Sequence, residues 1–215
     1  MRSVRNLVPI VLLSVMLPAV AFAGPYDALF EEKAKWVFSG TMETSNCVGP
    51  IDGWVCEGDC CKLEESFEMT CKVAEVKVDK KSSASRIVCL GSPKSAMGQS
   101  PSAMIAGCWL SDSKGLHHDP DCAALDAALE GLAKLEALLP AKPKASKWPK
   151  CKDEEVCVKT RVQADGDAWC AEEEVVGGDT MSSKRCIDRK RGLVSVSYDF
   201  AGGTAVFFTF QQKKD

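Results

Sequence analysis

Residues 193–210, LVSVSYDFAGGTAVFFTF, contain two strand-like segments separated by a pair of glycines. In the first segment, apolar residues at the even positions from Val194 to Phe200 alternate with polar residues at the odd positions from Ser195 to Asp199. Alternation with a period of two is typical of a strand with one face on a core and the other in water. Glycine pairs suit the turn of a hairpin. The stretch therefore predicts an antiparallel hairpin.

Similar alternation extends outward from this hairpin in both directions. Upstream of it, segments 156–163, 167–176 and 181–188 are separated by turn residues, which predicts an antiparallel meander over 151–215. The first half of the chain alternates in the same way over 36–44, 63–78, 85–91 and 103–111, with a Gly- and Cys-rich loop at 46–62. We therefore expect about nine strands in one or two antiparallel sheets.

Two segments have helical rather than strand-like spacing. The first is short and covers residues 26–35. The second starts at Asp119, which can cap a helix before Pro120, and its leucines form one apolar face up to Leu139. It predicts a central helix of about five turns, since a turn takes about 3.6 residues. The sequence thus predicts an α+β fold.

Residues 140–150, PAKPKASKWPK, are rich in proline and lysine. This composition predicts a semi-extended linker and the best internal boundary. A basic run can also dock an acidic partner, but we interpret it as a solvated linker. The expected organisation is a signal peptide (1–23), a helix with a meander and a Cys-rich loop (24–118), the central helix and linker (119–150), and a second meander (151–215).

The first 23 residues have the pattern of a secretory signal peptide. Arg2 and Arg5 precede an apolar stretch, and Ala21-Phe22-Ala23 is a small-x-small cleavage site. A transmembrane anchor is the alternative, but two prolines and a serine interrupt the apolar run, which is shorter than the roughly 20 residues that a span needs. We expect a secreted or periplasmic protein, cleaved near Ala23, whose mature chain has no membrane span.

The charge of the chain argues against nucleic acid as a partner. The net charge is −3, and removal of Arg2 and Arg5 with the signal peptide makes it −5. No basic face is evident in the pattern of charged residues, so polyanions are not expected to bind.

All twelve cysteines follow residue 23. An even number of cysteines in an exported chain predicts disulfides, here up to six, which reinforce a hydrophobic core. Residues that face each other across a hairpin are equidistant from its turn. Cys170 and Cys186 are centred on Gly178, and Cys89 and Cys108 are centred on a turn-like stretch at 98–99. These two pairs are the predicted disulfides, because opposed residues come within bridging distance.

The other eight cysteines have no deducible pairing. They are Cys47, Cys56, Cys60, Cys61, Cys71, Cys122, Cys151 and Cys157. Two cysteine triplets, each followed by a Gly-Leu dipeptide, suggest that the chain is a duplicated helix-plus-meander unit. The triplets are Cys71, Cys89 and Cys108, and Cys157, Cys170 and Cys186.

No catalytic or metal-binding signature appears in the sequence. The thiols of Cys56, Cys60, Cys61 and Cys71 have room for zinc, but export favours disulfides. The only histidines, His117 and His118, are expected in a polar loop before the central helix, and consecutive residues rarely reach one ion. We therefore expect no cofactor and no metal, and we consider an enzyme the least favoured of three hypotheses.

Two arrangements fit these patterns, and they imply different functions. Tandem modules favour an exported, non-catalytic binding or envelope-associated protein that engages another protein, with Trp54 and Trp148 as its contact surface. One strongly curved sheet favours a periplasmic carrier of a lipid or another apolar small molecule. Its lining would include Phe207, Phe208, Phe210 and Met104. The oligomeric state is left open.

Overall fold

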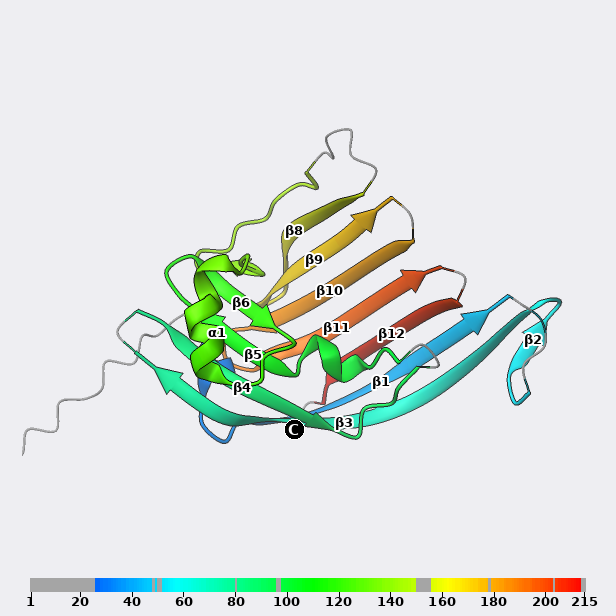
Figure 1. Cartoon of the computed structure of the whole chain (residues 1–215), viewed down its shortest axis with the longest axis horizontal. Helices are drawn as coiled ribbons and strands as arrows, with labels where there is room; N and C mark the ends of the chain where they lie inside the picture. Colours follow the sequence, from blue (N-terminus) through cyan, green and yellow to red (C-terminus); the bar gives the residue numbers. More distant parts are fainter. Residues whose placement is uncertain are drawn as a thin grey trace, which may run out of the picture.

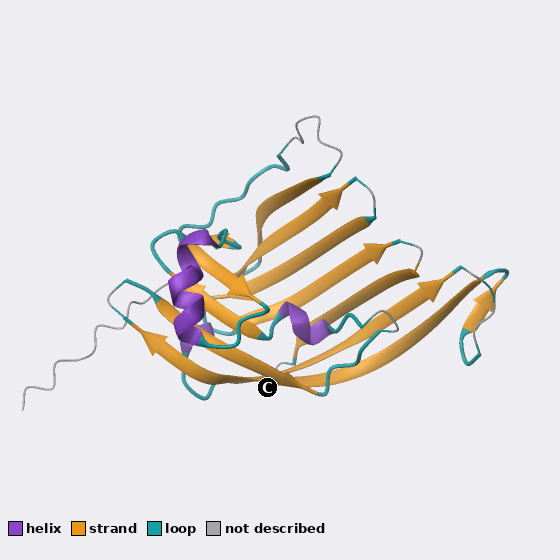
Figure 2. Ribbon diagram, viewed as in Figure 1, coloured by secondary structure: helices purple, strands orange, loops and turns teal. Residues whose placement is uncertain are grey.

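The computed structural model describes residues 26–47, 49, 52–79, 81–95, 98–149, 156–177, 179–202 and 204–213. The expected signal peptide at 1–23 lies outside the described residues. The described chain is almost entirely antiparallel sheet (Figures 1 and 2).

The strands of the first half run from β1 to β7. Their bounds are β1 (Lys35–Asn46), β2 (Val55–Glu57), β3 (Cys60–Val78), β4 (Ser83–Leu90), β5 (Gly107–Ser111), β6 (Gly115–Asp119) and β7 (Leu139–Pro140). The second half contributes β8 (Cys157–Asp165), β9 (Ala168–Val176), β10 (Thr180–Asp188), β11 (Gly192–Ala201) and β12 (Thr204–Gln212). The helical elements are α1 (Leu125–Gly131) and the 3-10 turns η1 (Asp27–Phe30), η2 (Pro101–Met104) and η3 (Leu132–Lys134).

These strands form one sheet of order β7-β6-β5-β4-β3-β1-β12-β11-β10-β9-β8, and β2 pairs with β3. The first and last strands of the chain's fold, β1 and β12, are neighbours, so both halves of the sequence share one sheet. The sheet curves until β7 contacts β9. Beyond β7, Ser146 N–H donates to the Val162 carbonyl of β8 (2.8 Å). The result is a nearly closed barrel, which excludes the tandem-module arrangement.

The inside of the barrel holds the main core. Fully buried side chains from β1, β3, β11 and β12 meet there, and η1 covers one end with Leu29. A smaller core lies outside the barrel, where α1 packs Leu125 and Ala128 against Ala84 of β4 and Leu110 of β5. Alternation with a period of two therefore serves two cores: one face of β4 and β5 points inward and the other lies under α1.

The predicted long central helix is wrong. Its first residue, Asp119, ends β6 and pairs with Cys108, and Cys122 is joined to Cys108 by a disulfide. Its last residue, Leu139, belongs to β7 and pairs with Leu116. Both ends of the predicted helix are thus committed to the sheet, and only α1 with the short η3 turn remains helical.

The α+β class and the strand count need the same correction. The structure has twelve strands instead of about nine, and the short N-terminal helix is the single 3-10 turn η1. The loop expected at 46–62 is largely a hairpin, because β2 and β3 pair through Val55↔Lys62 and Cys56↔Cys61. Two disulfides support that hairpin, so a Gly- and Cys-rich composition here conceals extended strands.

The disulfides do not follow the proposed duplication. In the second triplet Cys170 bonds Cys186, and the equivalent pair in the first triplet would be Cys89 and Cys108. The structure instead joins Cys71 to Cys89 and Cys108 to Cys122. The disulfide pattern therefore gives no support to a duplicated unit.

Candidate functional site

The concave face of the barrel carries a row of cross-strand neighbours at the end where β12 begins, on the right in Figure 1. Each member is the register partner of the next across seven strands. We call it the apolar row; it comprises Val158, Val175, Met181, Phe200, Val206, Thr44 and Leu63. Val206 is fully buried and Thr44 is 3% exposed, whereas Met181 and Phe200 are half-buried and Val158 is 66% exposed. The row therefore emerges from the core toward β8.

Aromatic rings form the deeper part of this face. Tyr198 and Phe208 are stacked at 4.8 Å between ring centroids, and Phe210 lies 6.1 Å from Phe208. Phe210 also packs edge-on against Phe38 at 5.5 Å. Gly40 is opposite Phe210 in the register, where a Cβ would lie 2.5 Å from the Phe210 Cβ. A glycine at this point lets the aromatic layer approach the wall of β1.

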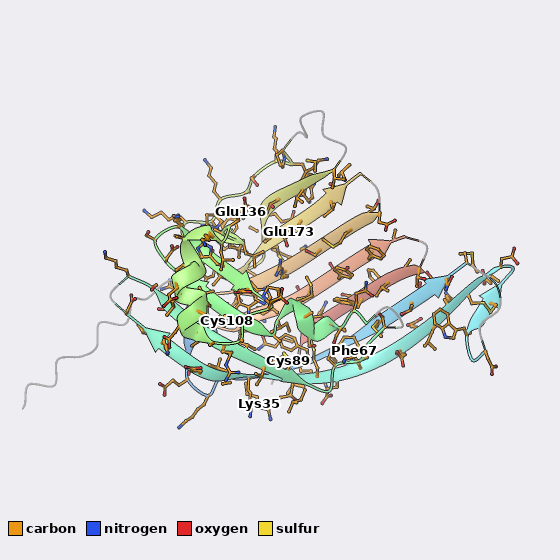
Figure 3. The ribbon with its side chains drawn as sticks, viewed as in Figure 1. Lys35, Phe67, Cys89, Cys108, Glu136 and Glu173 are labelled. Carbon is orange, nitrogen blue, oxygen red and sulfur yellow. A yellow bond between two sulfur atoms is a disulfide. The ribbon has the colours of Figure 1, made fainter. Side chains whose placement is uncertain are left out.

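A polar cluster crosses the inside of the barrel beside these rings. Arg185 of β10 is paired with Glu173 of β9, which is labelled in Figure 3, and Ser183 Oγ donates to the same carboxylate at 3.3 Å. Arg185 Nη1 also reaches His118 Nδ1 of β6 at 3.0 Å. The Arg185 side chain is only 12% exposed. One guanidinium thus connects β10 with β6 beside the line where the barrel nearly closes.

The hydrogen bonds of His118 define its protonation state. Its Nε2 lies 2.9 Å from the Ala106 carbonyl, so Nε2 carries the proton and donates it. Nδ1 is then the acceptor for Arg185. Burial, and next the positive charge of Arg185, lower the His118 pKa from 6.5 to about 4. Trp109 stacks on the ring at 4.4 Å and completes its enclosure. His118 is therefore neutral at pH 7.

The sequence placed both histidines in a loop, and this is corrected by the structure. They lie in β6 and point to opposite faces, His118 into the barrel and His117 outward, where its Nε2 contacts Asp112 Oδ1 at 3.1 Å. Sequence reasoning also missed Arg185 and Glu173. The only available signal was their place in the alternation of β9 and β10. Both residues occupy inward-facing positions, where an apolar side chain is usual, and both carry a charge instead.

Of the two predicted disulfides, one forms. Cys170 and Cys186 face each other in β9 and β10 with 4.0 Å between their Cα atoms, and they are bonded. The predicted Cys89–Cys108 bond is wrong, because Cys89 faces Cys71 across β3 and β4 while Cys108 faces Asp119. Cys89 is therefore bonded across the β3–β4 hairpin, and residues 98–99 are not the turn of a hairpin that joins Cys89 to Cys108.

No described cysteine is free, so the thiols considered as zinc ligands are unavailable. Among the described residues, one group of three metal-ligand types comes together, namely Asp165 with Cys170 and Cys186. The two cysteines are bonded to each other, which leaves a single carboxylate. The five disulfides between described residues are compatible with an oxidising compartment.

The tryptophans proposed as a contact surface occupy separate elements. Trp54 is half-buried in the turn before β2, and Trp148 is half-buried with the Arg161 guanidinium 4.6 Å from its ring. The proposed lining residues also divide. Phe208 and Phe210 are buried inside the barrel, Met104 packs against the main core, and Phe207 points outward with 42% exposure. Neighbouring residues of a strand cannot share a face, so Phe207 is excluded from the lining.

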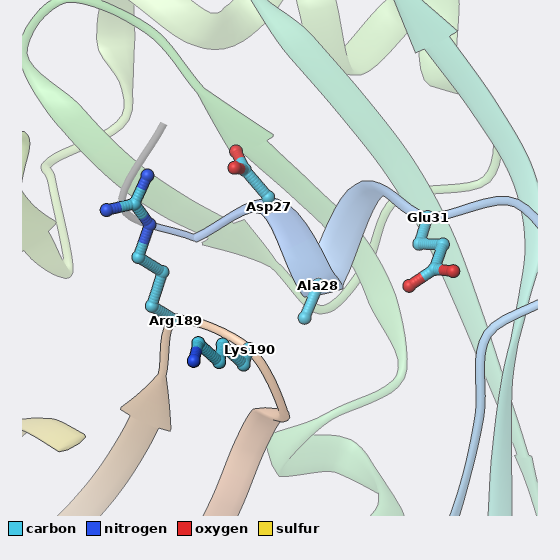
Figure 4. Close-up of a pocket in the computed structure, with 5 residues that line it drawn as sticks. All are labelled: Asp27, Ala28, Glu31, Arg189 and Lys190. Carbon is cyan, nitrogen blue, oxygen red and sulfur yellow. The ribbon is translucent and has the colours of Figure 1, made fainter. Parts of the chain in front are cut away.

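An open pocket lies at the other end of the barrel (Figure 4). It is an open depression of about 380 Å³ between η1 and the β10–β11 turn. Asp27, Ala28 and Glu31 line it from η1, and Arg189 and Lys190 line it from the turn between β10 and β11. Its mixed charges and open shape give it no preference for one ligand class.

Within the described residues, no helix has the length and apolar character needed to cross a membrane. Comparison with known proteins finds no match to a family model, to a curated protein or to a solved structure.

Proposed function

We propose that the protein binds an apolar small molecule on the concave face of its barrel, with no chemical step of its own. The observation that carries the proposal is the apolar row, which runs across seven strands. Its members Phe200 and Met181 are half-buried and Val158 is exposed, so the row extends from the core to the surface. Contiguous apolar side chains that are exposed on a protein surface commonly mark a binding site, and a concave face suits a small molecule.

The residues next to the apolar row suggest what kind of ligand fits. Ser183 and Glu173 are the neighbours of Met181 and Val175 two positions along the same strands, and Arg185 is two positions further. Arg185 Nε is buried with no hydrogen-bond partner among the described residues. An apolar molecule with one polar group would place its apolar part on the row and its polar group at this cluster.

The neutral fluorescent probe N-phenyl-1-naphthylamine tests the proposal, because its emission rises in apolar surroundings. We expect saturable binding to the oxidised protein. Phe200→Ser should weaken binding by about tenfold, since removal of a contact the size of a phenyl ring costs more than 1.4 kcal/mol. Phe207→Ser is the matched control, because Phe207 lies on β12 close by but points outward.

The control should bind the probe within about twofold of the wild type. Thermal melting of both variants checks that they fold, and Met181→Gln provides a second change in the row that removes no aromatic ring. Absence of saturable binding to the wild type, or equal affinity of Phe200→Ser and Phe207→Ser, would contradict the proposal.

A further inference from the structure

We propose that the edge of β8 binds an extended, acidic segment of a partner protein, which adds to the sheet as a further strand. This surface is the open edge of the sheet, which meets the concave face at Val158, and its role goes beyond the binding of an apolar ligand. β8 is the last strand in the sheet order and pairs only with β9.

The backbone of β8 offers hydrogen-bonding groups at this edge. Val162 N–H donates to Ser146 Oγ at 3.0 Å, and its carbonyl accepts from Ser146 N–H, so both groups of Val162 point away from β9. The β8–β9 register has no shift, which means that Thr160 and Val158 present their N–H and C=O groups in the same direction. Within the described part of the chain, no backbone hydrogen bond satisfies these groups of Thr160 and Val158.

The chain itself shows that this edge accepts an extended segment. The 141–149 segment lies along β8 through Ser146, whose contact ends at Val162. A partner strand would continue the same pairing over Thr160 and Val158. Strand addition of this kind derives its affinity from main-chain hydrogen bonds and its specificity from alternate side chains.

Apolar side chains are exposed along the part of the edge that the 141–149 segment leaves open. Val158 is 66% exposed and Val156 is 57% exposed. Long edges with exposed β-branched residues are the usual templates for pairing with another chain. The side chains on this side therefore favour a partner with alternating apolar residues.

The charges around the edge select an acidic partner. Lys142, Lys144 and Lys147 are exposed on the segment that accompanies β8, and Lys159 is half-buried on β8 itself. No ion pair engages these four lysines among the described residues. Lysines can also protect an edge from self-association, and they would then still attract acidic peptides, so the N-methylated peptide and Thr160→Pro below separate strand pairing from charge attraction alone.

Fluorescein-labelled acetyl-(Glu-Val)4-amide is the probe, with acetyl-(Lys-Val)4-amide as its charge-reversed counterpart. Fluorescence anisotropy with the oxidised full chain should show saturable binding of the Glu-Val peptide and at least about tenfold weaker binding of the Lys-Val peptide. A Glu-Val peptide with alternate amides N-methylated should lose binding, because it lacks the donors for strand pairing while the protein is unchanged.

Thr160→Pro removes one edge N–H without touching the ladder to β9, since this N–H points outward and proline is tolerated at sheet edges. We expect about five- to tenfold weaker binding of the Glu-Val peptide. Thr160→Val keeps the N–H and is the matched control, which should bind like the wild type. Melting and disulfide content of both variants check folding.

Three results would overturn the inference: no saturable binding of the Glu-Val peptide, equal binding of the Lys-Val peptide, or equal binding of the N-methylated peptide. A dimer of this chain that Thr160→Pro dissociates would assign the edge to a second copy and exclude the acidic partner. Phe200→Ser should leave peptide binding unchanged, so failure of this inference and failure of the apolar-ligand proposal can be told apart.

Discussion

Arg185 of β10 donates a hydrogen bond from Nη1 to His118 Nδ1 of β6, 3.0 Å away, although the two residues are 67 positions apart. The same guanidinium is paired with Glu173. This contact joins the two walls that meet where the barrel nearly closes. It requires a neutral imidazole, because a protonated Nδ1 cannot accept a hydrogen bond and would face a second positive charge.

The first expectation concerns pH. The folded-state pKa of His118, about 4, lies below its ordinary value of 6.5. The unfolded chain therefore binds the proton more tightly, and the free energy of unfolding falls as pH decreases from 6.5 to about 4. The full contribution is present above pH 6.5 and amounts to about 3 kcal/mol. Urea unfolding at pH 7.5 and pH 4.5 measures it.

His118→Gln is the control for this pH dependence, since glutamine can keep both hydrogen bonds and does not titrate. Its stability should change less over the same interval than that of the wild type. Burial raises the pKa values of Asp112 and Asp188, but hydrogen bonds together outweigh it and leave both pKa values lowered, so these groups contribute equally to both proteins at still lower pH. Identical pH profiles of the free energy of unfolding for the wild type and His118→Gln would contradict this account, because they would mean that His118 is not a buried, neutral group.

The second expectation concerns the Arg185–Glu173 pair. Arg185→Met leaves Glu173 inside the barrel without its cation, which should destabilise the fold by about 3 kcal/mol. The double variant Arg185→Met with Glu173→Met should recover a large part of that loss, because no charge then remains unpaired. Chemical denaturation of the two single variants and the double variant gives the coupling energy.

Lys213→Met is the matched control for this experiment. Lys213 pairs with Glu68 at the surface, where the side chains are 48% and 58% exposed, so its loss should cost less than about 1 kcal/mol. Additive effects of Arg185→Met and Glu173→Met would mean that the pair does not act as a unit.

The third expectation concerns Gly40. An alanine there would place its Cβ 2.1 Å from the Thr209 carbonyl oxygen and 2.5 Å from the Phe210 Cβ. Gly40→Ala should therefore destabilise the protein by about 3 kcal/mol through backbone displacement of β12. Gly131→Ala at the end of α1 is the contrasting change, because nothing lies within 4 Å of its Cβ and helix propensity favours alanine by up to about 1 kcal/mol. Melting temperatures that shift in the same direction would contradict this account.

The fourth expectation concerns disulfide connectivity and its energetics. Proteolysis without reduction, followed by mass spectrometry, should recover Cys71 linked to Cys89 and Cys108 linked to Cys122. Removal of Cys170–Cys186, which spans 16 residues, should cost about 3 kcal/mol, and removal of Cys56–Cys61, which spans 5, about 2 kcal/mol. A Cys89–Cys108 peptide in the digest would mean that β4 and β5 pair differently.

Local pattern was enough to recognise most of the sheet. Segments 167–176, 181–188, 193–200 and 204–210 match β9 to β12 within a few residues, because turn residues separate them and residues 194–200 alternate with a period of two. Cys170–Cys186 was predictable for the same reason: a tight hairpin determines which residues face each other. The helix at 119–139 was not, since leucines at helical spacing fit equally well a short helix followed by a strand.

The sequence by itself determined the antiparallel strands of the second half, the two faces of residues 194–200 and one disulfide, because all of these depend on residues close along the chain. Only the tertiary structure decided that one sheet unites both halves, that Cys108 meets Cys122, and that Arg185 meets His118. These contacts arise when β1 pairs with β12 and the sheet curves back to β7. Closure between distant segments depends on the summed twist and packing of every strand, which no local spacing encodes.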